Sequence, residues 1–245
     1  MSVPILEARN LTRRFHGLTA LNDVTFSLAQ DEILGLIGPN GAGKTTLVSL
    51  ISGTLPADEG ALLFQGAEIN HLPPFRRARL GIGRTFQVMK PFPGLSVLEN
   101  VMVGALFGFQ GGVESRTRAR EQAEFWLEFT GLQHRSEQRA ESLGGPDRKR
   151  LELAKALAMD PTLLLLDEVM AGLNPTEIDE VVLLVKRIRD EGVSILVIEH
   201  VMKAIRNLSD RVFVLHHGEK IAEGTPDTVF ADPRVVEAYL GRRRQ

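Results

Sequence analysis

The segment that decides the fold follows an apolar run at residues 33–37 and reads Gly38-Pro39-Asn40-Gly41-Ala42-Gly43-Lys44-Thr45-Thr46. Its glycines allow consecutive backbone N–H groups to turn toward phosphate oxygens, and a helix starting near Lys44 would point the positive end of its dipole at the same anion. The lysine supplies a charge for the terminal phosphates, and the Thr45 hydroxyl supplies a ligand for magnesium. A glycine-rich turn between a strand and a helix does not require Lys-Thr after its last glycine. The segment therefore predicts a loop that binds a nucleoside triphosphate.

Composition limits the classes of protein that fit. The chain has 245 residues, of which 43% are hydrophobic, enough for one large α/β domain or two small ones. With 29 basic and 31 acidic side chains the net charge is −2, which gives no global attraction to nucleic acid. Cysteine is absent, so a disulfide framework and a thiolate metal site are excluded. No apolar segment approaches the roughly 20 residues that cross a bilayer, so we expect any work at a membrane to depend on recruitment by another protein.

Apolar runs predict the sheet structure. Nearly continuous runs indicate strands buried on both faces of a mainly parallel sheet, at residues 33–37, 163–166, 193–198 and 212–215. Shorter, partly alternating segments predict a small antiparallel sheet, at residues 5–9, 24–28 and 61–64. The fold class is therefore α/β.

Residues 92–160 have helical spacing instead. Phe125, Phe129 and Leu132 recur at i, i+4 and i+7 among charged residues, which predicts one apolar helix face. Clustered glycines at residues 108–112 predict a loop between two helices. This part of the chain is expected to be a helical insertion.

Turn signals mark the ends of two further segments. A helix is expected over residues 151–159, because Asp160-Pro161 stops it before the next strand. Turns at residues 224–226 and 232–233, followed by a short helix, predict a packed terminal appendage.

An acidic pair follows the apolar run 163–166. A buried strand carries Asp167 to the carboxyl end of the sheet, where the phosphate loop also ends, so its carboxylate is suited to hold magnesium. Glu168, one residue further, is suited to polarise a water for attack on the γ-phosphate. Such a pair is often only a solvated turn or a helix cap. Four preceding leucines and an upstream phosphate loop favour the catalytic interpretation.

A histidine ends a neighbouring apolar run. Val197-Ile198-Glu199-His200 repeats the same arrangement, which predicts that His200 lies at the same sheet edge, within reach of the γ-phosphate and the attacking water. His216 and His217, followed by Gly218, are predicted to form a turn. Three other histidines show no metal-like spacing: His16, His71 and His134.

Taken in order, these motifs resemble those of the nucleotide-binding subunits of ABC transporters, over residues 6–241. The resemblance implies an α/β P-loop NTPase fold of the RecA-like type, with an antiparallel β subdomain and an inserted α-helical subdomain. The single nucleotide-binding domain would comprise an ATP-binding core at 1–91 and 160–225, a helical signature subdomain at 92–159 and an appendage at 226–245. The implied ligands are ATP and Mg²⁺.

The resemblance also assigns roles to individual residues. Thr85-Phe86-Gln87 is similar to the loop whose glutamine, here Gln87, ligates magnesium and senses the membrane partner. Ala171-Gly172-Leu173-Asn174 is similar to the dimer-contact loop, and His200 to the switch histidine. Phe15 matches the aromatic platform for adenine, with ordinary core packing as the alternative.

A finer resemblance points to importers of branched-chain and related hydrophobic amino acids, whose cytoplasmic ATPase is of the LivG type. It is carried by residues 83–87, 171–177, 222–226 and 237–241. The implied function is ATP hydrolysis that powers such an importer. The implied partners are ABC permease subunits and a second ATP-binding subunit, with a solute-binding protein involved only indirectly, and the implied location is peripheral, on the cytoplasmic face of the cell membrane.

The signature segment departs from the family. It reads Leu143-Gly144-Gly145-Pro146-Asp147, where the family usually has Leu-Ser-Gly-Gly-Gln. Gly144 lacks the serine hydroxyl that contacts the γ-phosphate across the dimer, and Pro146 lacks a backbone N–H but suits the first turn of a helix. Asp147 adds negative charge, which the basic residues 148–150 could offset. Loss of one charged hydrogen bond is worth about 1.5–3 kcal/mol, or roughly tenfold to a hundredfold in rate.

This departure leaves an alternative open, in which the chain is a catalytically weak, nucleotide-gated subunit of a heterodimer. An ABC ATPase acting on nucleic acid or ribosomes is disfavoured by the balanced charge and the single phosphate loop. A GTPase is disfavoured because no Asn-Lys-x-Asp segment occurs, and a kinase because no acceptor pocket or lid arginines can be located.

Overall fold

The computed structural model describes residues 3–85 and 91–240, so the predicted role of Gln87 falls outside the described residues. The chain divides into two compact units. The first comprises Met1–Pro74 and Met170–Gln245, and the second is Phe75–Val169.

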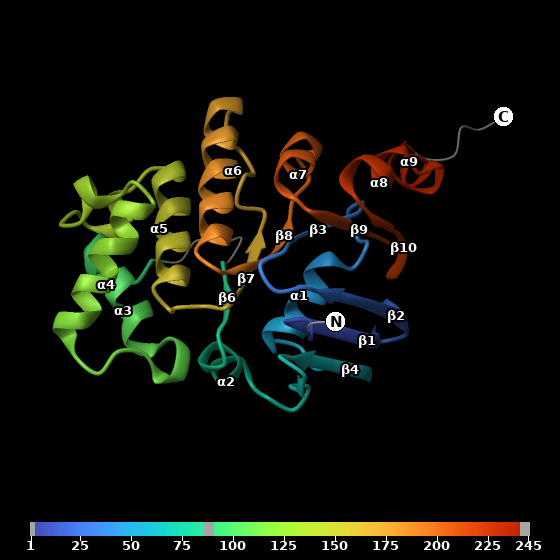
Figure 1. The fold of residues 1–245 in the computed structure, drawn as a ribbon, viewed down its shortest axis with the longest axis horizontal. Coiled ribbons are helices and arrows are strands. Elements are labelled where there is room, and N and C mark those ends of the chain that lie inside the picture. Colours follow the sequence, from blue (N-terminus) through green and yellow to red (C-terminus); the bar gives the residue numbers. More distant parts are fainter. Residues whose placement is uncertain (1–2, 86–90, 241–245) are drawn as a thin grey trace. The chain divides into compact units, whose positions relative to one another are not determined.

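The first unit contains the predicted antiparallel sheet (Figure 1). Its strand order is β2-β1-β4-β5, with bounds Leu6–Phe15 (β1), Leu18–Leu28 (β2), Glu59–Phe64 (β4) and Ala67–Glu68 (β5). β1 and β2 are about twice as long as predicted, because they continue to a two-residue turn at His16-Gly17, where both residues have positive φ. In the outer parts of these strands, exposed polar residues such as Asn10, Arg14 and Asn22 interrupt the buried leucines Leu11 and Leu21, so no apolar run marks them.

The first unit also contains a mainly parallel sheet segment, in the order β10-β9-β3-β8. The bounds are Ile33–Ile37 (β3), Ser194–Ile198 (β8), Arg211–His216 (β9) and Glu219–Gly224 (β10). β3 pairs in parallel with β8 and β9, and every residue of β3 and β8 is buried, which confirms the interpretation of the apolar runs. β10 pairs antiparallel with β9 and was not predicted, because half of its residues are charged and exposed.

Five helices in the described part of this unit accompany the sheets. They are α1 (Lys44–Ser52), α6 (Pro175–Asp190), α7 (Met202–Leu208), α8 (Pro226–Ala231) and α9 (Pro233–Leu240). The predicted terminal appendage is present as two short helices, α8 and α9, which contact each other and β10.

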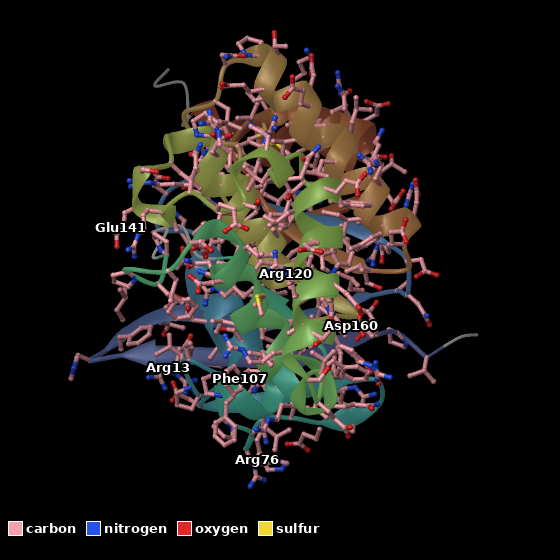
Figure 2. The ribbon with its side chains drawn as sticks, turned by 90° about the vertical axis from the view of Figure 1, so that its left-hand side faces the viewer. Arg13, Arg76, Phe107, Arg120, Glu141 and Asp160 are labelled. Carbon is pink, nitrogen blue, oxygen red and sulfur yellow. The ribbon has the colours of Figure 1, made fainter. Side chains whose placement is uncertain are left out.

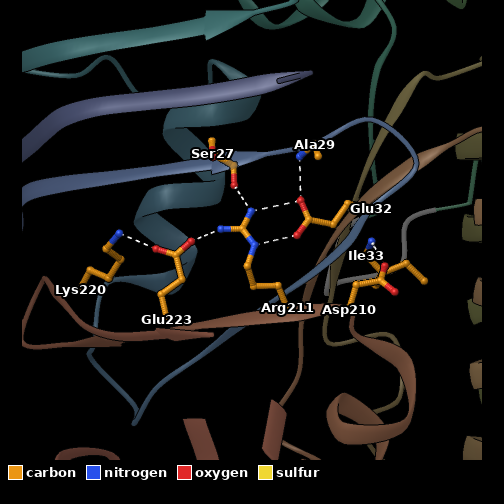
Figure 3. Close-up of polar contacts among 8 residues, drawn as sticks. All are labelled: Ser27, Ala29, Glu32, Ile33, Asp210, Arg211, Lys220 and Glu223. Carbon is orange, nitrogen blue, oxygen red and sulfur yellow. Dashed lines mark hydrogen bonds and ion pairs between the residues drawn. The ribbon is translucent and has the colours of Figure 1, made fainter. Parts of the chain in front are cut away.

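A cluster of polar contacts at the start of β9 links the two sheets of the first unit (Figure 3). Arg211 donates to both carboxylate oxygens of Glu32, at 2.8 and 3.1 Å, and to the Ser27 carbonyl oxygen of β2 at 2.6 Å. It also pairs with Glu223 of β10. The hydrogen bond with Glu32 is the largest of the contacts that raise the Arg211 pKa, so the guanidinium stays charged.

The second unit is largely helical. Its helices are α3 (Val97–Phe107), α4 (Arg116–Phe129) and α5 (Gly145–Leu157), preceded by α2 (Pro74–Arg79), which begins at the unit boundary. Single 3₁₀ turns lie at Phe109–Gly111, Gln133–Arg135 and Ala140–Ser142. Two parallel strands complete it, β6 (Ile82–Arg84) and β7 (Leu163–Asp167), of which β6 was not predicted.

The predicted apolar face of α4 is wrong. Phe125 is 51% exposed, and Leu132 is buried but lies beyond the end of the helix. The buried face is instead made by Ala119, Ala123, Trp126 and Leu127. Small alanines allow α4 to approach α3 closely, so packing rather than aromatic spacing selects the inner face. On α3, Phe107 also points outward and is 65% exposed (Figure 2).

α5 begins at Gly145 and ends at Leu157, so the predicted range 151–159 missed its first residues, although the expected place of Pro146 in the first turn is confirmed. Pro146 occupies the first turn, where its missing N–H costs no helical hydrogen bond. The charged residues 147–150 that follow are half-buried and extend the helix without adding to an apolar pattern. Within the described residues, no helix has the length and apolar character needed to span a membrane.

Candidate functional site

The phosphate loop runs from the end of β3 to the start of α1. Gly38, Gly41 and Gly43 have φ values of 152°, 79° and 104°, which favour glycine. A Cβ atom on Gly38 would lie 2.1 Å from the Leu215 carbonyl oxygen, and one on Gly43 would lie 2.6 Å from the Ala20 carbonyl oxygen. A side chain at Gly38 or Gly43 would therefore collide with the neighbouring backbone.

The turn between β9 and β10 supports this loop. Gly218 donates its N–H to the Ala42 carbonyl oxygen at 3.1 Å, and accepts from the Asn22 N–H at 2.8 Å. His216 ends β9 and His217 lies in the turn, so the prediction that they are turn residues at a strand exit is confirmed. Their rings lie 4.1 Å apart, beside a turn that is bonded to the phosphate loop.

Lys44 and the start of α1 are arranged to receive an anion. The Lys44 ammonium donates to the carbonyl oxygens of Gly38 at 2.6 Å and Pro39 at 2.9 Å, which holds its charge over the loop. The first turn of α1 has no acidic residue, and its N-cap Gly43 offers no side chain to the helix N–H groups. Thr45 is exposed in this turn. These backbone donors and the helix dipole are suited to bind phosphate.

His200 lies at the same sheet edge as the phosphate loop. In the parallel pair of β3 and β8, Leu36 is opposite Ile198, so Gly38 and His200 each follow two residues beyond that pair. His200 is exposed, whereas Glu199 before it is buried. An imidazole that faces solvent at this edge can contact the oxygens of a bound phosphate.

Phe15 ends β1 and is only half-buried, which argues against ordinary core packing. The Arg13 guanidinium lies 4.7 Å from the centre of its ring. A ring whose one face is covered by a cation and whose residue remains accessible is suited to stack a base.

In the second unit, Asp167 is 5% exposed and is held by residues around β6. Its N–H donates to the Thr85 hydroxyl at 3.2 Å, and its carboxylate pairs with the Arg84 guanidinium at 3.1 Å. The Thr85 N–H in turn donates to the Leu165 carbonyl oxygen at 3.0 Å. The ion pair of Arg84 with Asp167 was not predicted from the sequence, in which Arg84 appeared only within a motif of the subfamily. No local signal pointed to this ion pair, because the two residues lie 83 positions apart in the sequence.

Glu168 adopts an uncommon backbone conformation. Its φ is 52°, in the left-handed region of backbone conformation that residues other than Gly, Asn and Asp rarely adopt. The residue is half-buried. Such strain costs of order 1–3 kcal/mol and persists where the surrounding structure imposes it, often at functional sites.

The signature residues lie at the start of α5. Gly144 is the N-cap residue, and a Cβ atom on Gly144 or on Gly145 would meet open space. Arg148, one of the basic residues expected to offset the charge of Asp147, donates to the backbone carbonyl oxygens of Leu143 and Glu141 at 2.8 and 2.6 Å. The Asp147 carboxylate also forms an ion pair with the Arg135 guanidinium at 3.7 Å.

The loop at residues 171–174 ends in a capping box. The Asn174 side chain accepts from the Glu177 N–H at 3.0 Å, and the Glu177 carboxylate accepts from the Asn174 N–H at 2.8 Å. Asn174 therefore caps α6, which begins at Pro175. This local role does not depend on any contact of the loop with a second subunit.

The phosphate loop, the parallel sheet and the histidine at its edge define a P-loop ATP-binding cassette. The chain belongs to the ABC transporter family, whose model it matches over residues 21–171. A second match, over residues 219–244, is to the family described as branched-chain amino acid ATP-binding cassette transporter.

Relatives and solved structures agree with this assignment. LivG of Escherichia coli K12, named a high-affinity branched-chain amino acid transport ATP-binding protein, is 38% identical over 253 residues, covering 98% of this chain and 99% of the relative. The ADP conformation of an ATP-binding cassette from an ABC transporter superposes with a TM-score of 0.89 and 32% identity, covering 98% of this chain and all of that one. A dimeric bacterial ABC transporter cassette has a TM-score of 0.82 and 25% identity, covering 90% of this chain and 98% of that one.

Proposed function

We propose that this protein is the ATP-hydrolysing subunit that powers an importer of branched-chain or related hydrophobic amino acids. The observation that carries the proposal is the near-complete 38% match to LivG, combined with a phosphate loop and His200 at one edge of a parallel sheet. The family match in residues 219–244 supports the same solute class.

In the proposed reaction, the N–H groups at the start of α1 and the Lys44 ammonium bind the terminal phosphates of ATP. Glu168 accepts a proton from the attacking water, whose oxygen then bonds to the γ-phosphorus as the bond to the leaving ADP oxygen breaks. His200 donates a hydrogen bond to a γ-phosphate oxygen and orients it. Phe15 stacks on the adenine, which permits ATP without excluding other bases.

The oxygen donors of the chain fit a magnesium ion bound with ATP. Magnesium prefers hard oxygen ligands, and the proposal assigns the Thr45 hydroxyl, the Asp167 carboxylate and the Gln87 amide oxygen. The contact of Arg84 with one oxygen of Asp167 leaves lone pairs on that carboxylate for a metal. When bound, the ion would neutralise phosphate charge.

The proposed working unit is a dimer on the cytoplasmic face of the cell membrane. Each phosphate loop would face the partner's signature residues Gly144 and Gly145, as expected for a family in which a dimeric cassette is known. Permease subunits would dock around Gln87 and residues 88–92. The solute-binding protein would act only through the permeases, and nucleic acid has no part.

The catalytic step is tested with Glu168→Gln. Because the amide cannot accept a proton, turnover should fall by about a hundredfold or more while Mg-ATP affinity is retained. Glu191→Gln, an exposed glutamate at the end of α6, is the control and should hydrolyse ATP normally. Undiminished hydrolysis by Glu168→Gln would remove Glu168 from the role of base.

The transport assignment is tested by purifying the protein from native membranes and identifying what accompanies it. Permease subunits are the expected result. Recovery of nucleic-acid-binding proteins alone would contradict the assignment.

A further inference from the structure

A buried carboxylate joins two segments of the proposed site. Glu199 is 1% exposed, and its Oε1 accepts the Met170 N–H at 2.7 Å. Met170 is itself 1% exposed. Burying a carboxylate is costly unless its contacts offset the loss of water, and an apolar side chain would fill the same space at lower cost. The contact with Met170 therefore calls for an explanation beyond packing.

The positions of these two residues suggest that explanation. Glu199 lies between Ile198, the last residue of β8, and His200. Met170 directly precedes the loop 171–174, whose far end is fixed by the Asn174 capping box. The loop is thus anchored at both ends, and the anchor at its start is the neighbour of the histidine.

We propose that Glu199 is a positioning residue of the ATPase, which holds the loop 171–174 and His200 in one fixed arrangement. This inference rests on the proposed function, in which His200 orients the γ-phosphate and the loop faces a second subunit. Glu199 touches neither nucleotide nor water in this account, so it acts through Met170 and His200.

The proposal predicts an effect on turnover and not on binding. The groups proposed to bind phosphate belong to another segment of the chain, where the Lys44 ammonium donates to the carbonyl oxygens of Gly38 and Pro39 and the N–H groups start α1. Removing its carboxylate should release the start of the loop and loosen His200 while leaving the phosphate loop intact.

Three variants separate hydrogen bonding from charge and packing. Glu199→Met keeps the volume but removes the acceptor, and Glu199→Gln keeps a neutral oxygen that can accept from Met170. Asp210→Leu is the control, because the exposed Asp210 also accepts a backbone N–H, that of Ile33 at 2.8 Å (Figure 3). It precedes β9, at the end of the parallel sheet opposite to His200.

The measurement is kcat for ATP hydrolysis together with the Kd of Mg-ATP, on the full-length protein with its melting temperature recorded. Glu199→Met should lower kcat by about tenfold to a hundredfold with Kd unchanged within about threefold. Glu199→Gln should regain most of the turnover, and Asp210→Leu should keep it. Normal turnover in Glu199→Met, or a Kd that weakens by the same factor as kcat, would overturn the proposal.

If Glu199→Met does not fold, Glu199→Asp takes its place, because it keeps the charge but shortens the reach by one methylene. Lower kcat with unchanged Kd then supports the inference, and unchanged kcat overturns it. Absence of ATP hydrolysis by the wild-type protein would instead reject the proposed function, so the two failures are distinguishable.

Discussion

Glycine is required at the first position of the phosphate loop for two independent reasons. Gly38 has a φ of 152°, and the Leu215 carbonyl oxygen occupies the space that a Cβ atom would need. Gly41 has a similarly unfavourable φ of 79° but open space around it. Substitutions at Gly38 and Gly41 therefore distinguish the energetic cost of backbone strain from the cost of a steric collision.

We expect Gly41→Ala to lower the free energy of unfolding by about 1 kcal/mol, through strain alone. Gly38→Ala should cost at least about 2 kcal/mol more, since the loop must also move away from β9. Urea unfolding of both variants measures the difference. Equal stabilities would mean that the contact between Gly38 and β9 is not a constraint.

Tyr239 offers a direct probe of the same glycine, because it is the only tyrosine in the chain. Its hydroxyl oxygen accepts the Gly38 N–H, a contact that favours the phenolate, but burial dominates and raises its pKa to about 12. The residue as a whole is 39% exposed.

The phenolate absorbance of the folded protein should therefore titrate near pH 12, against about 10 in urea. Because the pKa is higher in the folded state, the protonated phenol stabilises the fold below about pH 10, and this contribution is lost as the pH rises toward 12. Tyr239→Phe should flatten the alkaline decline in melting temperature. A native titration midpoint near 10 would show that the hydroxyl faces water.

Among the helices, α5 shows how a departure from the family pattern affects local structure. Gly144 caps the helix without a side-chain contact, at φ −70° and ψ 171°, a conformation open to any residue. Serine fits the same space, because a Cβ atom there meets nothing within 4 Å. The missing hydroxyl is therefore not a requirement of the fold.

Gly144→Ser should increase the free energy of unfolding by a few tenths of a kcal/mol through capping. It should also raise ATP turnover by about tenfold, because the hydroxyl restores a contact with the partner's γ-phosphate. Gly144→Ala is the control, adding the Cβ without the hydroxyl. If both variants hydrolyse ATP at the wild-type rate, the altered signature does not limit turnover.

α4 shows the limit of periodicity as a guide. The pattern of Phe125, Phe129 and Leu132 correctly indicated a helix but selected the wrong face, because small residues such as Ala119 and Ala123 do not stand out in an apolar pattern. The buried face of α4 depends on how closely α3 can approach it. That distance is set by tertiary packing, which a local sequence pattern does not contain.

Across the whole chain, local patterns predicted the phosphate loop and the strands that carry the site. Parallel pairing alone places Gly38 and His200 at one edge, so that part of the site followed from the sequence. Contacts between distant positions did not. Glu199 with Met170, and Arg84 with Asp167, join residues 29 and 83 positions apart, and no local rule links them.

The central claim is that the loop at residues 38–46 captures the phosphates of ATP. Calorimetric titration of the purified protein with Mg-ATP tests it most directly, with Lys44→Ala as the variant and Lys203→Ala, an exposed lysine of α7, as the control. We predict one site per chain, retained in Lys203→Ala and weakened at least about tenfold in Lys44→Ala. No heat of binding with the wild-type protein, or equal affinity in Lys44→Ala, would contradict the account.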